Sequence, residues 1–284
     1  MIKVTALDGP FGASVSGVDV SCPDSPETSE ELRAALAEHH VLVIEDVPFT
    51  DAQFAKFGRI WGEPITFFNP RDRDREHPEI ILISNSPKTP TALRDGAMHW
   101  HQDSTYEHPA AEFTMLSAVE APIGANSTLF ADLTAAFESL PADRRAFLRT
   151  LRVIHDRAGS PQELMFDDER RGSTGGTPGE NVVVHPLVIR HPITGRESLY
   201  GISGTPTGIE GVTPDDAYAL LRDLKSLALQ AEFRQEATAA VGCVLIWDNL
   251  AVMHCATTTE YSDEPGHRRR VRRISTHLGG PISN

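Results

Sequence analysis

Two stretches indicate the fold of this chain: Met98-His99-Trp100-His101-Gln102-Asp103-Ser104 and, far downstream, Trp247-Asp248-Asn249-Leu250-Ala251-Val252-Met253-His254. On an extended strand residues i and i+2 point to the same face, so His101 and Asp103 could both reach one ion while Gln102 points away. His254 would come from a distant strand, as it can when a sheet closes on itself and both strands line one interior. Two imidazoles and one carboxylate are the ligand set typical of non-haem iron(II) sites.

The His101-x-Asp103 pair also has a plainer interpretation. A hydrogen bond between a histidine and an aspartate at the end of a strand gives the same pattern and needs no metal. His99 lies two residues before His101, but a His99-x-His101 pair lacks the carboxylate. The motif alone therefore leaves a metal site and a structural pair open.

Further short motifs run through nearly the whole chain in a fixed order. They are Leu7–Ala13, Gly17–Asp19, His40–Ile44, Trp100–Asp103, Gly124–Phe130, His185–Val188, His191–Arg196, Trp247–Asn249, His254 and Arg273–Thr276. In this order the chain resembles the taurine dioxygenase (TauD/TfdA-like) family of Fe(II)- and 2-oxoglutarate-dependent dioxygenases. The resemblance implies a double-stranded β-helix, or jelly roll, and an oxidoreductase that uses Fe(2+), 2-oxoglutarate and O2.

The resemblance also implies a role for individual residues. His101, Asp103 and His254 match the three iron ligands, and Thr128 matches the hydroxyl that binds a carboxylate of 2-oxoglutarate. Arg269 matches the arginine that grips the far carboxylate of 2-oxoglutarate. Arg273, four residues later, would lie near the primary substrate, where it either holds an anionic group or only supports the pocket.

The arginine register is the open point of this assignment. His267–Arg273 contains five arginines, and a planar guanidinium suits a carboxylate because it can form two parallel charge-assisted hydrogen bonds. Arg269 and Arg273 would share a face of a strand. Arg270 is the competing anchor, and a solvated basic turn is the structural alternative.

The family resemblance predicts a class of reaction but not a substrate. We expect hydroxylation of an unactivated C–H of a small, anionic organic substrate, with release of succinate and CO2. Desaturation or oxidative decarboxylation in natural-product biosynthesis would use the same residues. Ala97, Thr66 and Asn69 stand where the taurine enzyme holds its substrate with other residues, so taurine is disfavoured. Asp103 disfavours halogenation, which needs a small residue there.

Two other classes of protein stay open. A zinc-dependent hydrolase could use two histidines and a carboxylate, but no glutamate stands beside a ligating histidine to act as its base. A metal-free jelly-roll binding protein would share the fold and the charge. The hydrolase would leave Thr128 and Arg269 unexplained.

Composition supports a small-molecule partner. The chain has 284 residues and a formal net charge of −14, which argues against binding to nucleic acid or to anionic membranes. Three cysteines without metal-knuckle spacing predict a reducing, cytoplasmic setting. We expect no membrane span, one domain over residues 1–284, and a homo-oligomer, a dimer or a tetramer as in relatives.

The local patterns predict a mixed α+β, mainly β chain in which helices decorate the jelly roll. Helices are expected at Ser29–His39 with Thr28 and Glu31 as a capping box, from Thr50 toward Trp61, over Leu133–Leu151 with a break at Pro141, and from Thr213. Strands are expected at Val41–Ile44, Phe113–Ala118, Thr128–Ala131, Val182–Leu187, Val241–Ile246 and Arg273–His277. Segments within 70–96 and 167–180 are candidate lids or plain surface loops.

Overall fold

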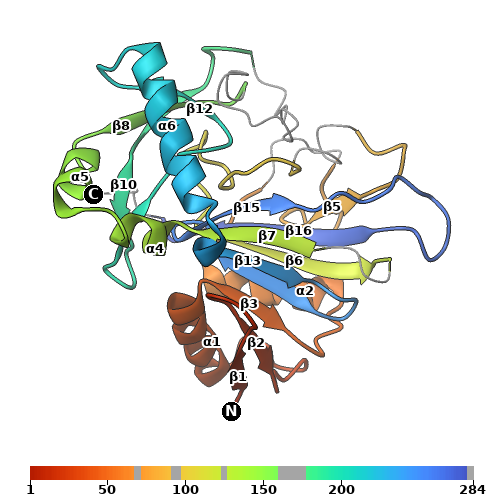
Figure 1. The fold of residues 1–284 in the computed structure, drawn as a ribbon. Helices are drawn as coiled ribbons and strands as arrows, with labels where there is room; N and C mark the ends of the chain where they lie inside the picture. Colours follow the sequence, from red (N-terminus) through yellow and green to blue (C-terminus); the bar gives the residue numbers. More distant parts are fainter. Residues whose placement is uncertain (67–71, 91–96, 123–126, 159–176, 280–284) are drawn as a thin grey trace.

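Two facing layers of β-strands form the centre of the molecule, with helices on both outer sides (Figure 1). The computed structural model describes residues 1–66, 72–90, 97–122, 127–158 and 177–279. Strands outweigh helices, as the predicted mixed and mainly β class requires. That residues 1–284 form one domain stays a prediction.

The larger sheet has eight strands in the order β1-β2-β3-β14-β6-β16-β4, and β5 also pairs with β16. β2 and β3 run parallel, and the other pairs of this sheet run antiparallel. The strands are β1 (Lys3–Ala6), β2 (Ala13–Ser16), β3 (Val41–Ile44), β4 (Glu63–Pro64), β5 (Ile81–Ser84), β6 (Phe113–Glu120), β14 (Val244–Asp248) and β16 (Arg270–His277).

The facing layer is built from smaller antiparallel sheets. One has the order β13-β7-β15, a second has β12-β8-β9, and a hairpin joins β10 to β11. These strands are β7 (Ser127–Asp132), β8 (Arg152–Asp156), β9 (Val182–Pro186), β10 (Val188–Arg190), β11 (Glu197–Leu199), β12 (Pro206–Ile209), β13 (Arg234–Thr238) and β15 (Val252–Ala256).

Side-chain alternation decides what lies between the sheets. Along β14, Leu245 and Trp247 point inward and pack against Phe130 of β7, while Val244 and Ile246 point to the outer side. This follows from the two-residue repeat of a strand. The interior is therefore lined from both sheets, as a jelly roll requires.

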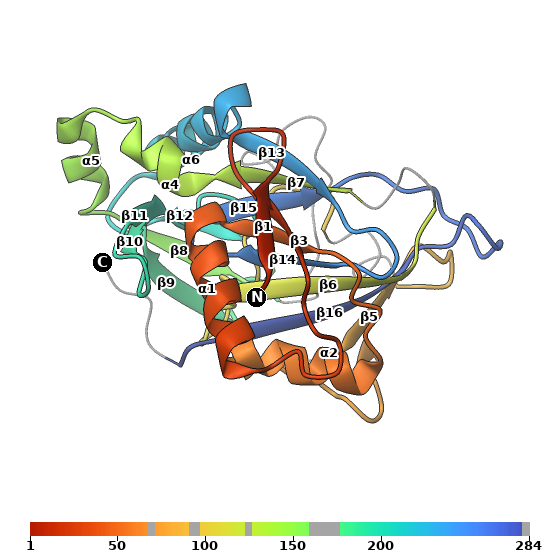
Figure 2. The ribbon, with the colours of Figure 1, turned by 90° about the horizontal axis from the view of Figure 1, so that it is seen from below.

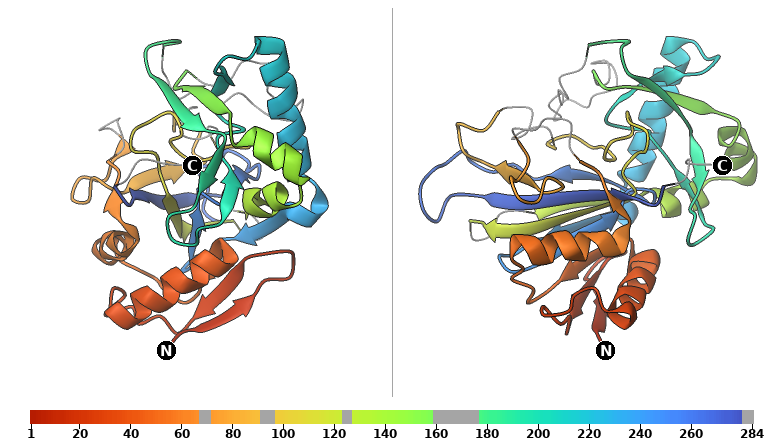
Figure 3. Two further views of the ribbon diagram at one scale, coloured as in Figure 1. Left: turned by 90° about the vertical axis from the view of Figure 1, so that its left-hand side faces the viewer. Right: turned by 180° about the vertical axis from the view of Figure 1, so that it is seen from behind.

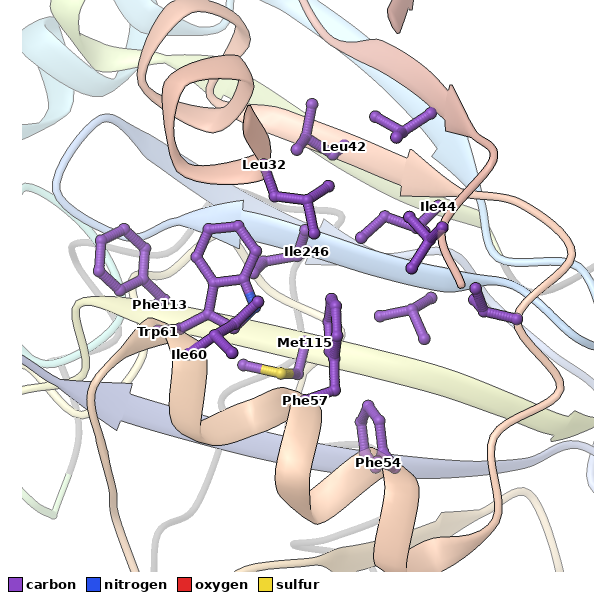
Figure 4. Close-up of a cluster of buried hydrophobic side chains, with 14 of the residues drawn as sticks. Leu32, Leu42, Ile44, Phe54, Phe57, Ile60, Trp61, Phe113, Met115 and Ile246 are labelled. Atoms are coloured by element: carbon purple, nitrogen blue, oxygen red, sulfur yellow. The ribbon is translucent and has the colours of Figure 1, made fainter. Parts of the chain in front are cut away.

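The outer face of the larger sheet is covered by α1 (Pro26–His39) and α2 (Asp51–Gly58), which continues into η1 (Arg59–Trp61). Figure 2 shows both helices in front of this sheet. Between them lies an apolar cluster that includes Leu32, Phe57, Trp61 and Ile246, all at most 1 % exposed (Figure 4). Burying side chains of this size stabilises the fold by about 1.5–3 kcal/mol each.

The smaller sheets are covered on their outer side by α4 (Leu133–Glu138) and α6 (Pro214–Ala228), and α6 lies away from α1 (Figure 3). α6 buries Leu221 and Leu224 against Met253 of β15. The remaining elements are α5 (Ala142–Leu148) and η4 (Ala231–Phe233). Helices thus hold β7 and β15 from behind while the opposite faces of these strands line the interior.

Most predicted elements are confirmed, and one helix start is wrong. Thr50 caps α2 in a capping box with Gln53, and Thr213 caps α6 with Pro214 at its first position. α1 begins at Pro26, because Ser25 accepts a hydrogen bond from Thr28 N and proline suits the first turn. The expected capping box at Thr28 and Glu31 is therefore not the start of this helix.

Three other expectations concern loops, cysteines and membranes. Of the segments 70–96 and 167–180, residues 70–71, 91–96 and 167–176 lie outside the described residues, and a lid role for these segments stays a prediction. Cys22, Cys243 and Cys255 are all free thiols. Among the described helices, none has the length and apolar character needed to cross a membrane.

Candidate active site

The backbone joins His101 to His254. The amide nitrogen of His101 lies 2.9 Å from the carbonyl oxygen of His254, and the reciprocal distance is 2.8 Å, so the two residues form an isolated antiparallel bridge. Their ring centroids are 4.2 Å apart. His254 projects between the sheets from β15, on the same face as Val252. Residues far apart in sequence are therefore fixed side by side, as predicted.

Asp103 completes the cluster. Its Oδ1 lies 3.6 Å from Nε2 of His101, and its Oδ2 lies 3.8 Å from Nε2 of His254. One ligand atom from each residue falls within 4.8 Å of the others. The expected strand geometry is wrong, because residues 103–106 form a turn in which Ser104 has a φ of 55°. The turn, rather than strand alternation, aims Asp103 at the two rings.

The atoms that face one another suit a metal ion. Nδ1 of His101 lies 2.7 Å from the carbonyl oxygen of His99; a carbonyl only accepts, so Nδ1 carries the hydrogen and Nε2 keeps its lone pair. Metal-binding histidines commonly hold their other nitrogen in this way. Within the described part of the chain, buried Oδ2 of Asp103 has no hydrogen-bond partner. A divalent cation would satisfy this oxygen.

Burial and charge keep Asp103 and His254 in the states that bind a metal. Burial raises the pKa of the Asp103 carboxyl, but the Arg273 guanidinium, followed by His254 and His101, outweighs burial and holds this pKa well below its usual range. Burial, and then the neighbouring His101, lowers the pKa of His254 well below its ordinary value. Asp103 is therefore a carboxylate and His254 a neutral imidazole at neutral pH.

Asn249, which is fully buried, holds the turn that carries Asp103. Its Oδ1 accepts hydrogen bonds from Asp103 N at 3.2 Å and from Trp247 Nε1 at 3.0 Å. Its Nδ2 donates to Thr114 Oγ1 at 3.0 Å. The Trp247 ring in turn lies 4.6 Å from the His254 ring, centroid to centroid. One amide thus links two of the candidate ligands to the larger sheet.

Gln102 points away from the cluster, as predicted. Its Nε2 donates to Asn249 O at 2.5 Å, and its Oε1 accepts from Gly201 N at 2.7 Å. These two hydrogen bonds hold both polar atoms of the Gln102 side chain away from the candidate metal ligands. The alternation expected for these three residues is therefore met without a regular strand.

Thr128 lies on β7 and is 4 % exposed. It has the same parity on this strand as Phe130, which packs in the interior 6.2 Å from the His254 ring, whereas Leu129 and Ala131 pack outward under the helices. Thr128 also pairs directly with Ala256 of β15. The hydroxyl of Thr128 therefore projects into the interior. Thr128 lies two residues before Phe130 on β7, and Phe130 is the residue that pairs with His254.

Arg269 and Arg270 have opposite surroundings. Arg269 is partly buried and burial lowers the pKa of its guanidinium to about 10, whereas Arg270 is exposed. Arg269 has the parity of Val271, which packs in the interior, and Arg270 has that of Arg272, which contacts Asp51 on the outer side. The arginines therefore do not form a plain basic turn, because β16 begins at Arg270 and directs Arg270 and Arg272 to one face and Arg273 to the other.

Arg273 projects toward the three candidate metal ligands, His101, Asp103 and His254. Its Nη1 lies 3.6 Å from Asp103 Oδ1, and its side chain is 20 % exposed where that of Asp103 is 4 %. Burial raises the pKa of both Tyr106 and Glu107, which lie in the electrostatic field of Arg273 and Arg157. Arg273 and Arg157 are therefore both close enough to Tyr106 and Glu107 to influence their ionisation.

The sequence did not single out Asn249, Glu107 or Arg157 as site residues. Asn249 belongs to the Trp247–Asn249 motif, which could have directed attention to it. Glu107 and Arg157 carry no motif of their own. Ala97, Thr66 and Asn69 are the residues that disfavour taurine as the substrate. The carbonyl of Ala97 accepts a hydrogen bond from Ala256 N at 2.8 Å, and Thr66 is exposed. Asn69 lies outside the described residues.

The other histidines that drew attention have structural settings. His185 Nε2 donates to Thr105 O at 3.0 Å, and buried His155 contacts Thr205 Oγ1 at 3.1 Å. His191 Nε2 lies 2.6 Å from Asp248 Oδ2. His99 stacks against His101 at 4.8 Å between centroids. Cys255 packs under the outer helices and is absent from the ligand cluster found among the described residues.

The comparison with known families decides where this chain belongs. The model of the "Taurine catabolism dioxygenase TauD, TfdA family" matches residues 3–275. The chain belongs to this family. It is 31 % identical to the alpha-ketoglutarate-dependent 2,4-dichlorophenoxyacetate dioxygenase of Cupriavidus pinatubonensis over 94 % of each chain. It is 29 % identical to pentalenolactone F synthase of Streptomyces arenae over 99 % of this chain and 97 % of that one.

A solved structure of a similar protein agrees with the fold. The crystal structure of AAD-2 in complex with Mn(II) and N-oxalylglycine matches with a TM-score of 0.79 and 26 % identity, covering 100 % of both chains. The protein is therefore an oxidoreductase of the alpha-ketoglutarate-dependent dioxygenase kind. The predicted family, fold class and enzyme class are confirmed.

Proposed function

We propose that His101, Asp103 and His254 hold Fe(2+) and that Thr128 and Arg269 bind 2-oxoglutarate beside it. The observation that carries the proposal is the convergence of three ligand atoms within 4.8 Å. Three protein ligands leave positions open for 2-oxoglutarate and O2. When bound, the metal supplies the oxidative chemistry, and the protein supplies binding and orientation.

The two anchors would act on opposite ends of 2-oxoglutarate. Thr128 offers a short, buried hydroxyl close to the histidine strand, which suits the carboxylate next to the keto group. Arg269 offers a planar, partly buried guanidinium, which suits bidentate pairing with the far carboxylate. Exposed Arg270 lacks this environment, so the geometry favours Arg269 as the anchor.

We infer that the primary substrate is a small organic anion. Arg273 faces the metal cluster from its more exposed side, and Arg157 adds a second cation near Glu107 and Tyr106. Relatives named for 2,4-dichlorophenoxyacetate and for sulfonate are consistent with an anion. If Arg273 instead only supports Asp103, its replacement by alanine will leave the dependence on substrate concentration unchanged.

The proposed outcome is hydroxylation of an unactivated C–H, with release of succinate and CO2. Desaturation and oxidative decarboxylation would use the same residues, and mass analysis of the product separates the three. Hydroxylation adds one oxygen atom, whereas desaturation removes two hydrogen atoms. A homo-oligomeric state, dimer or tetramer, is also proposed and is measured by light scattering.

Metal content and thermal stability test the proposal before any substrate is known. A ligand that binds only the folded state raises its melting temperature. We expect protein purified without chelator to bind iron, and 2-oxoglutarate to raise the melting temperature only when iron or manganese is present. Zinc content without an effect of 2-oxoglutarate would indicate a hydrolase. Neither metal nor a shift would indicate a binding protein.

A further inference from the structure

Asn85 contacts the two ends of the loop that connects β15 to β16, which we call the neck of the loop. It follows β5 directly and is 4 % exposed. The loop leaves β15, which carries His254, and returns to β16, which carries Arg273. Asn85 has no part in the proposed metal site, and yet it contacts both arms of this loop.

The return arm is held through Arg269. Its backbone N donates to Asn85 Oδ1 at 2.7 Å, and Asn85 N donates to Arg269 O at 3.2 Å. The β5–β16 ladder ends at the pair Ser84 and Arg270. Asn85 thus adds one further pair to the ladder, in which its side chain replaces a backbone acceptor.

The same side chain holds the rest of the neck. Its Nδ2 donates to Glu260 O at 2.6 Å and to His267 O at 3.0 Å, and its own carbonyl accepts from Ser262 N at 3.2 Å. The outgoing and returning arms are therefore tied by one amide. Both hydrogens of this amide are used, and an aliphatic side chain offers none of these bonds.

We propose that Asn85 is a positioning residue for 2-oxoglutarate binding, acting through Arg269. This inference rests on the proposed function, in which Arg269 is the anchor. Arg269 lies just outside β16, so the regular ladder does not fix its backbone, and Asn85 does so instead. A bidentate guanidinium–carboxylate contact depends on orientation, so a shift of the Arg269 backbone should weaken its contact with 2-oxoglutarate.

The test uses the full-length, Mn(II)-loaded protein and calorimetric titration with N-oxalylglycine, in which an NH replaces one methylene of 2-oxoglutarate. Asn85→Asp keeps the acceptor for Arg269 N but sets an oxygen against the carbonyls of Glu260 and His267. Asn85→Ala controls for the added charge. Ser84→Ala is the matched control, because it removes only the bond from Ser86 N to Ser84 Oγ at 3.1 Å.

We expect Asn85→Asp and Asn85→Ala to weaken N-oxalylglycine binding by about tenfold, the effect of weakening one hydrogen bond to a charged group. Mn(II) affinity should stay unchanged in both variants, and Ser84→Ala should bind N-oxalylglycine as the parent does. In steady-state turnover the KM for 2-oxoglutarate should rise and kcat at saturation should stay constant. A merely structural role would lower the melting temperature without this division between KM and kcat, and that result would overturn the inference.

The double variant Asn85→Asp/Arg269→Ala separates the inference from the proposed function. If Asn85 acts through Arg269, its effect disappears in the Arg269→Ala background. If Arg269→Ala weakens binding and Asn85→Asp adds the same factor in both backgrounds, the positioning inference is wrong and the anchor stands. If Arg269→Ala itself has no effect, the proposed anchor is wrong, and the inference falls with it.

Discussion

Replacing Arg269 by alanine should greatly weaken 2-oxoglutarate binding, and replacing Arg270 should not. The two side chains are neighbours in sequence with the same chemistry. Arg269 is partly buried with the parity of the interior face, and Arg270 is exposed on the outer face. The pair of variants is therefore a matched comparison in which only the direction of the side chain differs.

The magnitude follows from the burial of Arg269. Burial lowers its pKa from 12.5 to about 10, and at 1.36 kcal/mol for each pH unit this corresponds to about 3 kcal/mol lost by the charged form. A paired carboxylate offsets this cost. Truncating one partner of a buried, hydrogen-bonded charge pair typically costs about 2–5 kcal/mol, so we expect the Kd to rise between about 30-fold and several thousand-fold.

The assay is calorimetric titration of the Mn(II)-loaded protein with 2-oxoglutarate in the absence of oxygen. The Mn(II) affinity of each variant is measured alongside, so that a lost metal is not mistaken for a lost anchor. Arg270→Ala should bind within about twofold of the parent, since exposed charges contribute little. A large loss in Arg270→Ala with a normal Arg269→Ala would refute the assignment of the two faces.

Three further predictions concern the metal, its support and the buried histidines. Asp103→Ala should lower Mn(II) affinity by more than about 100-fold, since losing a supporting residue alone costs up to that much, and circular dichroism should show an unchanged fold. Asn249→Ala removes three buried hydrogen bonds and should lower the free energy of unfolding by about 3 kcal/mol in urea titrations. It should also lower Mn(II) affinity by about tenfold. Unchanged Mn(II) affinity would contradict the conclusion that Asn249 supports Asp103. Burial lowers the pKa of His185 from 6.5 to about 4. As the pH falls below 6.5, His185 is therefore protonated in the unfolded chain before it is protonated in the folded protein. The stabilising contribution of the neutral imidazole, present above pH 6.5, is lost as the pH falls toward 4. His185→Gln should therefore flatten the loss of unfolding free energy between pH 7 and pH 5, and an unchanged slope would count against the buried neutral imidazole.

The sequence predicted the strands and most helix starts because these depend on local patterns. Thr213-Pro214 and Thr50 each cap a helix as expected, and Val41–Ile44 forms β3 with the predicted bounds. The start of α1 was wrong because two capping signals overlap, and Ser25 before Pro26 prevails over Thr28. Alternation predicted only that Arg269 and Arg273 share a face of a strand, and the choice of Arg269 over Arg270 as the anchor stays a prediction.

The site was predicted in composition but not in construction. His101, Asp103 and His254 converge, yet a turn and a single backbone bridge do what a strand was expected to do. The supports could not be foreseen, because Asn249 reaches Asp103 across 146 positions and Asn85 reaches Arg269 across 184. Such contacts depend on how the sheets stack, and no local pattern records them.

Anaerobic titration of the iron(II)-loaded protein with 2-oxoglutarate tests the central claim most directly. Chelation of iron(II) by a keto acid gives a weak visible charge-transfer band. We predict that this band appears in the parent protein and is lost in His254→Ala. If iron is bound and no band appears, Thr128 and Arg269 do not bind 2-oxoglutarate beside the metal, and the proposed site is wrong.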